Sequence, residues 1–419
     1  MANQEMGHSP GDKPGIFYGY IIAIVAFFIM FVFLGTYGAF GVFFKPILTE
    51  FGWTRAMTSG AFSLSLIIGG LLGVIAGRLT DKFGPRPVMT GCGFLLALGY
   101  LLMSQINSIW QLYLFFGIII GIGMAGVWIS MMSTIARWFV RRRSLMTGLV
   151  VAGVGIGGLI GPLVANHLIS IYDWRTAYIT LGITVLITVI PAAQFLRRAP
   201  TQEELIAHNQ NENKENGLES DTKSLSFHEA VHTRQFWLFT TMVFCFGFCL
   251  FAIRVHIAPH ATELGFSSAT AATVLAAIGG VGIIGNATLG STGDRLGNRQ
   301  VFIISFILMA ASLFWLLPAV EVWNLYLFAG VFGIARGGLD SVESPLIAEL
   351  FGLESHGLIY GVITLGFTIG GAMGPVIAGY IFDVTGSYQL AFLISAFVAT
   401  AGFILAATLR PIKGTYVQN

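Results

Sequence analysis

Three ionisable residues lie close together inside a long apolar segment of this chain. Residues 322–348 contain Arg336, Asp340 and Glu343, which follow one another at spacings of four and three. On a helix these spacings place the three side chains on one face. An arginine can hold a carboxylate with its planar donors, and a neighbouring carboxyl group can take up a proton. The cluster therefore predicts a site that binds an anion and a proton together, with a structural Arg336–Asp340 ion pair as the alternative.

A second arginine and two aromatic residues are further candidates for contact with a ligand. Arg254 lies near the end of the apolar segment 236–258, where it either guides anions inward or extends to the polar boundary of that segment. Tyr37 and Trp128 belong to two other apolar segments, and each could line a cavity. Aromatic side chains in such segments usually just pack against their neighbours, so packing is the alternative for both.

Two histidines are candidates for carrying protons. His256 and His260 are four residues apart, with Pro259 between them. Histidine changes its charge near neutral pH. A proline disturbs regular helix geometry at this point, and hydrogen-bonded histidines at a helix end are the alternative interpretation. The cysteines and histidines have none of the spacings of a metal site, so we expect no metal.

Twelve apolar segments must position these residues. Hydrophobic residues make up 55% of the chain and charged residues only 10%, whereas a soluble domain carries roughly 25% charge. A helix of about 20 apolar residues crosses the hydrocarbon core of a bilayer. The sequence therefore predicts an all-α integral membrane protein with twelve transmembrane helices. They are expected near residues 17–44, 56–77, 86–105, 109–135, 144–169, 176–196, 236–258, 268–290, 300–318, 322–348, 357–382 and 388–409.

The chain repeats itself after 213 residues. The stretch Trp110–Phe115 matches Trp323–Phe328, and similar matches extend along the chain without a gap. Two parallel repeats in a membrane protein are typical of a transporter whose site lies between the repeats. We therefore expect two pseudo-symmetric halves of six helices each, residues 1–198 and 236–419, joined by a polar linker at 199–235.

The lysines and arginines predict the orientation of the chain. With the N-terminus in the cytoplasm, seventeen of them fall in cytoplasmic segments and three on the opposite side. Positive residues accumulate in cytoplasmic loops, so both termini and the linker are predicted to be cytoplasmic in a multi-pass protein of the cell membrane. The first apolar segment has neither a charged leader nor a small-residue cleavage site, and we expect a retained helix.

The loop after the second apolar segment occurs twice. Residues 77–86 read GRLTDKFGPR, and residues 290–299 read GSTGDRLGNR at the matching place in the second half. Both resemble the signature loop of the major facilitator superfamily, and the resemblance implies that the loops hold the two halves together on the cytoplasmic side. Glycine allows close packing at a helix end, and aspartate can accept hydrogen bonds from helix N-termini and basic groups. The expected gating residues are Gly77, Asp81, Arg86, Gly290, Asp294 and Arg299.

A narrower resemblance covers the chain apart from the linker. Residues 138–153, WFVRRRSLMTGLVVAG, are similar to the fifth-span signature of monocarboxylate porters. The resemblance implies transport of small organic anions such as lactate or pyruvate, often with a proton. Such porters usually carry an arginine in the eighth span, where this chain has Asn286. The substrate is therefore either bound differently or a different acid, and Asn286 joins Arg254 and Arg336 as a candidate contact.

We therefore predict a secondary transporter of small monocarboxylates, coupled to protons, that works by alternating access. One alternative is an organic-anion exchanger that resembles oxalate–formate antiporters, and another is a membrane sensor that binds an acid without transporting it. The expected partners are a small organic acid, protons and lipid, with the chain as a monomer. Patterns of the form G-x-G-x-x-G lie inside apolar segments without a preceding strand, so we expect no nucleotide cofactor and no enzyme. The net charge of +2 does not favour nucleic acid.

Overall fold

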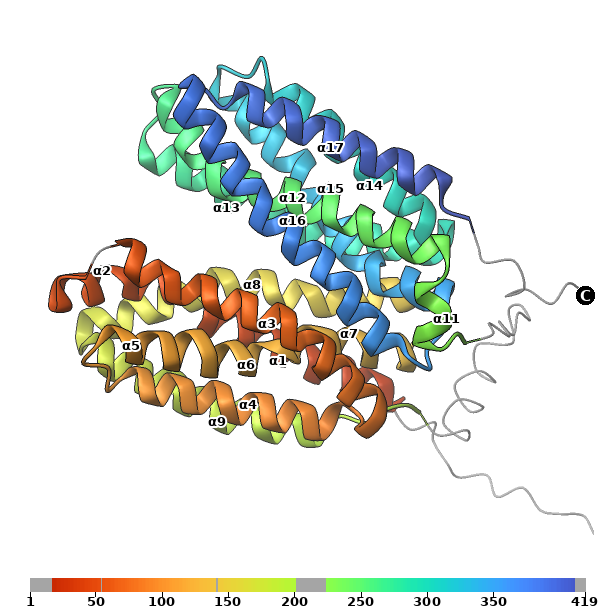
Figure 1. The fold of residues 1–419 in the computed structure, drawn as a ribbon, viewed down its shortest axis with the longest axis horizontal. Helices are drawn as coiled ribbons and strands as arrows, with labels where there is room; N and C mark the ends of the chain where they lie inside the picture. The colour runs from red at the N-terminus through yellow and green to blue at the C-terminus, as the bar shows by residue number, and fades with distance from the viewer. Residues whose placement is uncertain (1–16, 54, 141, 201–223, 411–419) are drawn as a thin grey trace, which may run out of the picture.

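The computed structural model describes residues 17–53, 55–140, 142–200 and 224–410, and Figure 1 shows their arrangement. This part of the chain contains twelve helical segments that are long and apolar enough to cross a membrane. They coincide with the twelve predicted segments apart from a few residues at their ends, so the predicted all-α membrane architecture is confirmed. Most of the predicted linker and both ends of the chain lie outside the described residues.

The first half forms six spans. Its elements are α1 (Tyr18–Gly38), α2 (Phe40–Phe51), α3 (Arg55–Phe83), α4 (Pro85–Met103), α5 (Ile109–Leu112), the π-helix η1 (Tyr113–Ile120), α6 (Gly121–Ala125), α7 (Val127–Trp138), α8 (Arg143–Ile171) and α9 (Trp174–Gln194). The first span is divided at Ala39, and the fourth contains the π-helical turns. Polar residues mark where helices begin: the Asp173 carboxylate accepts a hydrogen bond of 2.6 Å from the backbone N–H of Thr176 at the start of α9.

The second half forms the other six spans. Its elements are α11 (Phe227–Val231), α12 (Arg234–Glu263), α13 (Ser268–Leu296), α14 (Asn298–Leu316), α15 (Val322–Phe351), α16 (His356–Thr385) and α17 (Gln389–Thr408). The short helix α11 lies in the predicted linker region and is joined to this half by a hydrogen bond of 2.9 Å from Leu225 N–H to the Phe351 carbonyl. α12 continues past Pro259 instead of breaking there, because membrane helices tolerate proline where neighbouring groups compensate.

The two halves have matching internal structure. α1 packs against α8 in the first half as α12 packs against α16 in the second, and α4 packs against α9 as α14 packs against α17. Gly52 and Gly265 both have positive φ, at 65° and 90°, and Gly84 and Gly297 do so at 86° and 96°. These pairs are one repeat apart in the sequence, so both halves use glycine for the same left-handed turns.

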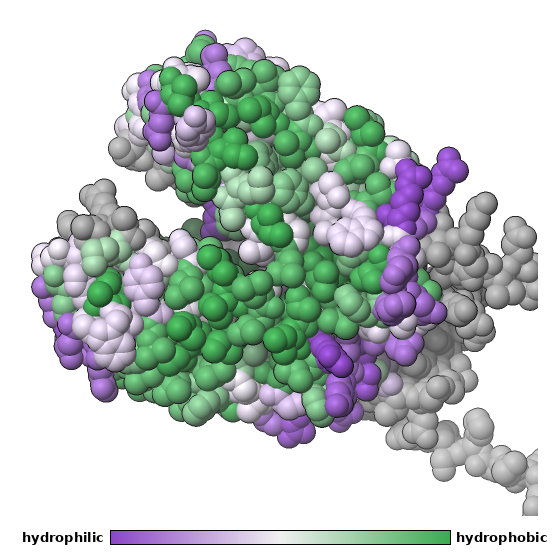
Figure 2. All heavy atoms as spheres, in the orientation of Figure 1, coloured by the Kyte–Doolittle hydropathy of each residue, from purple (hydrophilic) through white to green (hydrophobic). Residues whose placement is uncertain are grey.

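The two halves meet at the end nearest the linker and diverge at the other end. Most contacts between the halves join α8 to α13 and α3 to α16, and α15 and α16 also pack against helices of the first half, α15 against α7 and α8 and α16 against α7. Figure 2 shows a hollow between the halves at the end away from the linker, with apolar surface around the flanks. Large apolar side chains such as Ile24 and Val376 are exposed, as expected for a protein whose helices meet lipid.

Candidate functional site

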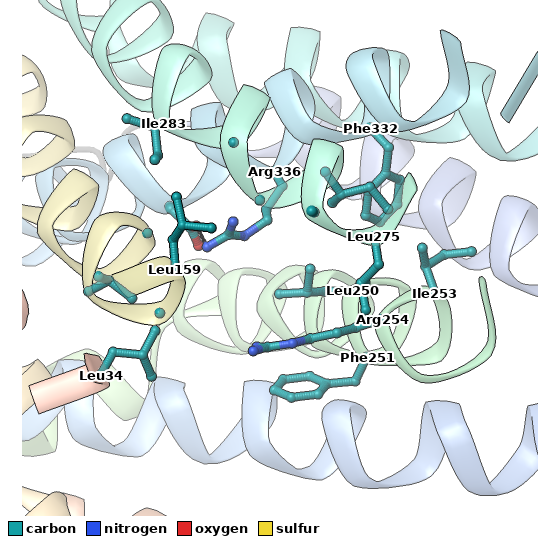
Figure 3. Close-up of a pocket in the computed structure, with 18 of the residues that line it drawn as sticks. Leu34, Leu159, Leu250, Phe251, Ile253, Arg254, Leu275, Ile283, Phe332 and Arg336 are labelled. Atoms are coloured by element: carbon teal, nitrogen blue, oxygen red, sulfur yellow. Dashed lines mark ion pairs between the residues drawn. The ribbon is translucent and has the colours of Figure 1, made fainter. Parts of the chain in front are cut away.

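A cavity of about 540 Å³ lies between the two halves. Leu34 of α1, Trp128 of α7 and Leu159 of α8 line it from the first half. The second half contributes residues from α12, α13, α15 and α16, and Figure 3 shows how side chains from both halves point into the space. A site at the interface of two repeats is where the repeat in the sequence predicted it.

The three charged residues of α15 line this cavity together. One guanidinium nitrogen, Nη2, of Arg336 lies 3.1 Å from Oδ2 of Asp340. Glu343 also lines the cavity but is only 5% exposed. Among the residues that the structure describes, it has no hydrogen-bond or ion-pair partner. A carboxyl group buried without a partner costs free energy when it is ionised, and charged groups inside a membrane are candidates for function.

Close helix packing fixes the direction in which these side chains point. A Cβ atom on Gly337 would lie 2.4 Å from the carbonyl oxygen of Gly282 on α13. A Cβ atom on Gly338 would lie 2.2 Å from the hydroxyl oxygen of Ser305 on α14. No larger residue fits at these contacts without a shift of the helices. α15 is therefore held with its glycine face against its neighbours and its charged face toward the cavity.

Arg254 brings a second positive charge into the cavity from α12. Figure 3 shows its guanidinium and that of Arg336 entering the same space from two different helices. Within the described part of the chain, no hydrogen bond or ion pair involves Arg254. Its side chain lines the cavity, which favours the first of the two interpretations from the sequence.

Trp128 lines the cavity and also joins the two halves. Its indole N–H donates a hydrogen bond of 2.8 Å to the hydroxyl oxygen of Tyr360 on α16. Tyr360 is fully buried. The predicted contact of Trp128 with a ligand therefore involves its ring, because its only donor is already engaged.

Two other predicted contacts do not line the cavity. Tyr37 is 5% exposed, its ring stacks on Phe62 at 5.0 Å, and its hydroxyl lies 2.9 Å from Oγ of Ser65. Asn286 is 2% exposed, and its backbone carbonyl accepts a hydrogen bond of 2.9 Å from Ser341. Tyr37 thus packs inside the first half, and Asn286 lies at helix contacts. Neither side chain lines the cavity in this conformation, so the placement does not support their predicted role in substrate binding.

The two histidines also lie outside the cavity lining. His256 is held by a contact of 2.9 Å between Nε2 and the carbonyl oxygen of Pro375. His260 is 8% exposed and lies edge-on to the ring of Phe392, with 5.0 Å between ring centres. Both side chains are enclosed between α12, α16 and α17, so this conformation does not place them on a proton path through the cavity. The interpretation as hydrogen-bonded histidines at a helix end fits His256, whereas Nε2 of His260 is buried without a hydrogen-bond partner among the described residues.

Asp81, in the last turn of α3, and Asp294, in the last turn of α13, each bind the start of a helix in the opposite half, so the predicted loops are largely helical. The Asp81 carboxylate accepts hydrogen bonds from the backbone N–H groups of Gly357 at 2.9 Å and Leu358 at 2.8 Å. The Asp294 carboxylate accepts from Ser144 at 2.8 Å and from Leu145 at 2.9 Å in the same way. A negative charge at a helix N-terminus satisfies free donors and stabilises the helix dipole. These four bonds join the halves at the linker end.

The other four loop residues divide into two kinds. Gly77 and Gly290 lie at the contact between halves, where a Cβ atom would meet the Gly357 carbonyl oxygen at 2.1 Å and the Ser144 carbonyl oxygen at 2.7 Å. The two arginines bond within their own halves. Arg86 donates to Oε1 of Gln194 on α9 at 2.8 Å, and Arg299 donates to the Ala407 carbonyl on α17 at 2.7 Å. They do not cross the interface in this conformation.

Sequence reasoning missed two residues that join the halves or support that contact. Arg137 lies 2.5 Å from Asp81, and both side chains are about nine-tenths buried. In the sequence, Arg137 served only as one of the basic residues that predict the orientation of the chain in the membrane. Tyr360 receives the hydrogen bond from Trp128. The motif at 77–86 contains the partner of Arg137, but nothing in the sequence pairs two residues so far apart. Tyr360 carried no signal, because a tyrosine in an apolar segment is ordinary.

Comparisons with known proteins agree with this arrangement. A family model described as the Major Facilitator Superfamily matches residues 26–292 and 259–418. The chain is 28% identical over 401 residues to monocarboxylate transporter 13 of Bos taurus, and the match covers 95% of this chain and 91% of the relative. It is also 28% identical over 324 residues to the uncharacterized MFS-type transporter YhjX of Escherichia coli, with 75% of this chain and 76% of that protein covered.

Solved structures show the same fold. The Escherichia coli fucose:proton symporter FucP aligns with a TM-score of 0.71 at 17% identity and covers 94% of this chain and 100% of its own. The human organic anion transporter MFSD10 aligns with a TM-score of 0.70 at 14% identity and covers 93% of this chain and 99% of its own. At these identities the likeness concerns the arrangement of helices and carries no information on the ligand.

Proposed function

The chain belongs to the major facilitator superfamily, and from that premise we propose that it carries small monocarboxylates together with protons by alternating access. Family membership and the twelve spans make it a multi-pass membrane transporter and not an enzyme. The observation that carries the proposal is the cavity in which Arg254, Arg336, Asp340 and Glu343 come together. The relatives named monocarboxylate transporters support the choice of substrate class.

The two arginines supply the anion site. Arg336 uses part of its guanidinium for Asp340, but a guanidinium has five N–H donors in a planar fork, so donors remain for a second carboxylate. Arg254 has no carboxylate partner among the described residues. A substrate carboxylate bound between the two guanidinium groups would therefore meet donors from α12 and α15.

The charges of the cavity couple this anion to a proton. Arg254 and Arg336 contribute two positive charges and Asp340 one negative charge, so the sum is +1 when Glu343 carries a proton and zero when it does not. Binding of a monoanion to the protonated site returns the sum to zero. The cavity is thus neutral when it holds both proton and anion, or neither. A site with only one of them has a net charge, which is costly to enclose in a membrane.

Alternating access would then move the site between the two sides. The structure has its halves joined at the linker end by Asp81 and Asp294 and separated at the other end. Closing the open end over a neutral cavity and releasing the aspartate contacts would expose the site toward the linker. With the linker in the cytoplasm, as the distribution of Lys and Arg predicts, the conformation seen here faces outward.

Replacement of Glu343 tests the coupling. Glu343→Gln fixes the uncharged state at this position, so the loaded cavity stays neutral while the empty cavity keeps a charge of +1. In proteoliposomes we expect the variant to exchange labelled acid across the membrane but to lose uptake driven by a proton gradient. The same charge count predicts the same outcome for Asp340→Asn.

Glu321→Gln is a matched control, since Glu321 is exposed in the loop before α15. It should accumulate acid in response to a proton gradient as the parent does. If Glu343→Gln also accumulates acid like the parent, proton coupling through this residue is wrong. If the parent neither binds nor carries any monocarboxylate, the proposed substrate class is wrong.

A second candidate function is exchange of organic anions without protons. The lack of an acidic partner for Arg254 favours it, because both arginines could then pair with carboxylates. Counterflow that proceeds equally with and without a pH gradient, in the absence of net uptake, would support exchange over symport.

A further inference from the structure

Among the residues that the structure describes, all of the charge in the cavity comes from one half of the protein. Arg254 lies on α12, and Arg336, Asp340 and Glu343 lie on α15. Among the side chains that the structure describes, the first half lines the cavity with no charged group. The sequence repeat agrees, since the positions one repeat earlier are uncharged. They are Gly41, Gly123, Val127 and Ser130.

The first half presents an apolar wall instead. Leu34, Val154 and Leu159 face the cavity together with Gly155 and Gly158. Its one polar lining side chain is Trp128, whose only donor is engaged by Tyr360. A ligand in this cavity therefore meets charge on one side and hydrocarbon on the other.

We infer that the substrate is a monocarboxylate with an extended apolar body, which the second half binds by its carboxylate and the first half contacts by its body. This inference rests on the proposed function and narrows its substrate class. A branched, aromatic or longer aliphatic acid would contact both the charged and the apolar sides of the cavity. A short hydroxy acid would contact only the charged side.

The polar groups outside the charged cluster support this choice. Thr364, whose hydroxyl donates to the carbonyl oxygen of Tyr360 at 2.8 Å, lies on α16 of the second half, so it adds no polar group to the wall formed by the first half. Trp128 has no second donor. A hydroxyl group at the far end of a substrate would be removed from water against Leu34 and Leu159 without a partner, and such a group loses binding free energy.

The cavity, which is open at the end away from the linker in this conformation, has room for such a body. Its volume of about 540 Å³ lies within the range of roughly 300–1,000 Å³ that is typical of sites for drug-sized ligands. A three-carbon acid has only six non-hydrogen atoms and would leave most of this space to water. A larger apolar body would fill the space and displace water from the leucine wall.

The division has a consequence for transport. The described lining of the first half contains no charged group, so its contacts with the ligand are mainly contacts with the apolar body. Closure of the two halves over the cavity depends on contacts with both. A short acid should therefore bind more weakly than an acid with an extended apolar chain. It should also be carried more slowly once bound, because it makes few contacts that stabilise the first half in the closed position.

Binding of an aliphatic series to the full-length protein tests the inference. Calorimetry in detergent would compare acetate, butyrate and hexanoate at one pH, with the ω-hydroxy analogue of hexanoate as a matched ligand. We expect affinity to rise up to about fourfold for each added CH₂, the transfer value for burial of a methylene. The terminal hydroxyl should remove most of that gain. In proteoliposomes the maximal rate should rise along the same series.

Two leucines of α8 provide a matched pair of variants. Leu159 lines the cavity and is 59% exposed, whereas Leu163 is 65% exposed and lies outside the cavity lining. Leu159→Asn should reduce the preference for hexanoate over acetate and raise the affinity of the hydroxylated analogue relative to that of hexanoate. Leu163→Asn should leave the ligand order as in the parent.

The outcomes separate this inference from the proposed function. If acetate and hexanoate bind with equal affinity and both affinities are lost in Arg336→Lys, the inference that the substrate has an apolar body is wrong. The proposed binding of monocarboxylates would still stand. If Leu159→Asn leaves the preference for hexanoate unchanged, the inference that the first half contacts the apolar body is wrong. If none of the acids binds, the proposed function itself fails.

Discussion

At the scale of single residues, the two arginines of the cavity differ in what surrounds them. Arg336 shares its charge with Asp340 at 3.1 Å, whereas Arg254 has no such partner among the described residues. Arg336 is therefore held in place before any ligand arrives, and Arg254 is free to adjust. A held guanidinium can present two donors to a carboxylate in a fixed geometry, so the cost of replacing Arg336 distinguishes a substrate site from a structural pair.

Arg336→Lys keeps the charge but loses the planar fork. We expect the affinity for the substrate acid to fall about tenfold or more, since a hydrogen bond to a charged group contributes about 1.5–3 kcal/mol and tenfold corresponds to about 1.4 kcal/mol. Calorimetric binding to purified protein measures the change. Arg175→Lys is the control, because Arg175 pairs with Glu50 at 2.6 Å and does not line the cavity. If Arg336→Lys binds and transports the acid like the parent, the Arg336–Asp340 ion pair has a structural role only.

At the scale of helices, Asp81 and Asp294 both join the two halves, but only Asp81 is also part of an ion pair among the described residues. Asp81 and Asp294 each accept two backbone hydrogen bonds from the first turn of a helix in the opposite half. Asp81 also has Arg137 at 2.5 Å. No ion pair accompanies Asp294 within the described residues. The gating role of both residues remains a prediction, and this asymmetry allows a test of it.

Asp81→Asn and Asp294→Asn should both slow transport more than they weaken equilibrium binding, because neither residue lines the cavity. Asp81→Asn should have the larger effect. It leaves Arg137 buried without its partner, and removal of one member of a buried pair costs roughly 3–5 kcal/mol. Rates in proteoliposomes and affinities in detergent separate the two quantities. Adding Arg137→Met to Asp81→Asn should restore part of the loss, and a further loss instead would contradict the buried-pair account.

The glycine contacts between halves give a second test at this scale. Gly77→Ala places a Cβ atom where the Gly357 carbonyl oxygen lies at 2.1 Å, so α3 and α16 must separate. We expect the variant to favour the conformation that is open at the linker end, as measured by distances between spin labels on these two helices. Gly91→Ala is the matched control, because nothing lies within 4 Å of a Cβ atom there. Equal distances in both variants would show that this contact does not hold the closed end.

At the scale of the whole molecule, the repeat gives two halves of one architecture with different chemistry. Both halves use glycine at the same turns, and both bind a helix of the other half through a loop aspartate. The described charge of the cavity comes from the second half alone. In the proposed mechanism the symmetry of the halves allows the site to open to either side, and the difference between the halves would orient the ligand within the site.

The orientation of the whole molecule in the membrane is open to direct measurement. A reporter inserted in the linker at 199–230, most of which lies outside the described residues, should be found in the cytoplasm. The physical reason is the excess of Lys and Arg on that side of the spans. An extracytoplasmic reporter would reverse the orientation and make the conformation described here inward-facing.

The sequence determined the properties that depend on local composition and spacing. Runs of apolar residues specify the twelve spans, since each must satisfy its backbone within a helix of membrane length. The repeat placed the site between two halves, and the spacings of Arg336, Asp340 and Glu343 placed them on one face. The boundaries of the two halves near 198 and 236 stay predictions, because most of the linker is not described.

Only the tertiary structure decided which candidates meet. Arg254 reaches the same cavity as Arg336, while Tyr37, Asn286, His256 and His260 lie outside the lining. The sequence could not separate them, because in a membrane span a side chain that faces lipid, a neighbouring helix or a cavity can be of the same type. The rotation of each helix follows from close contacts such as that of Gly337 with α13. Those contacts join residues far apart in the chain, so they exist only after the helices have packed.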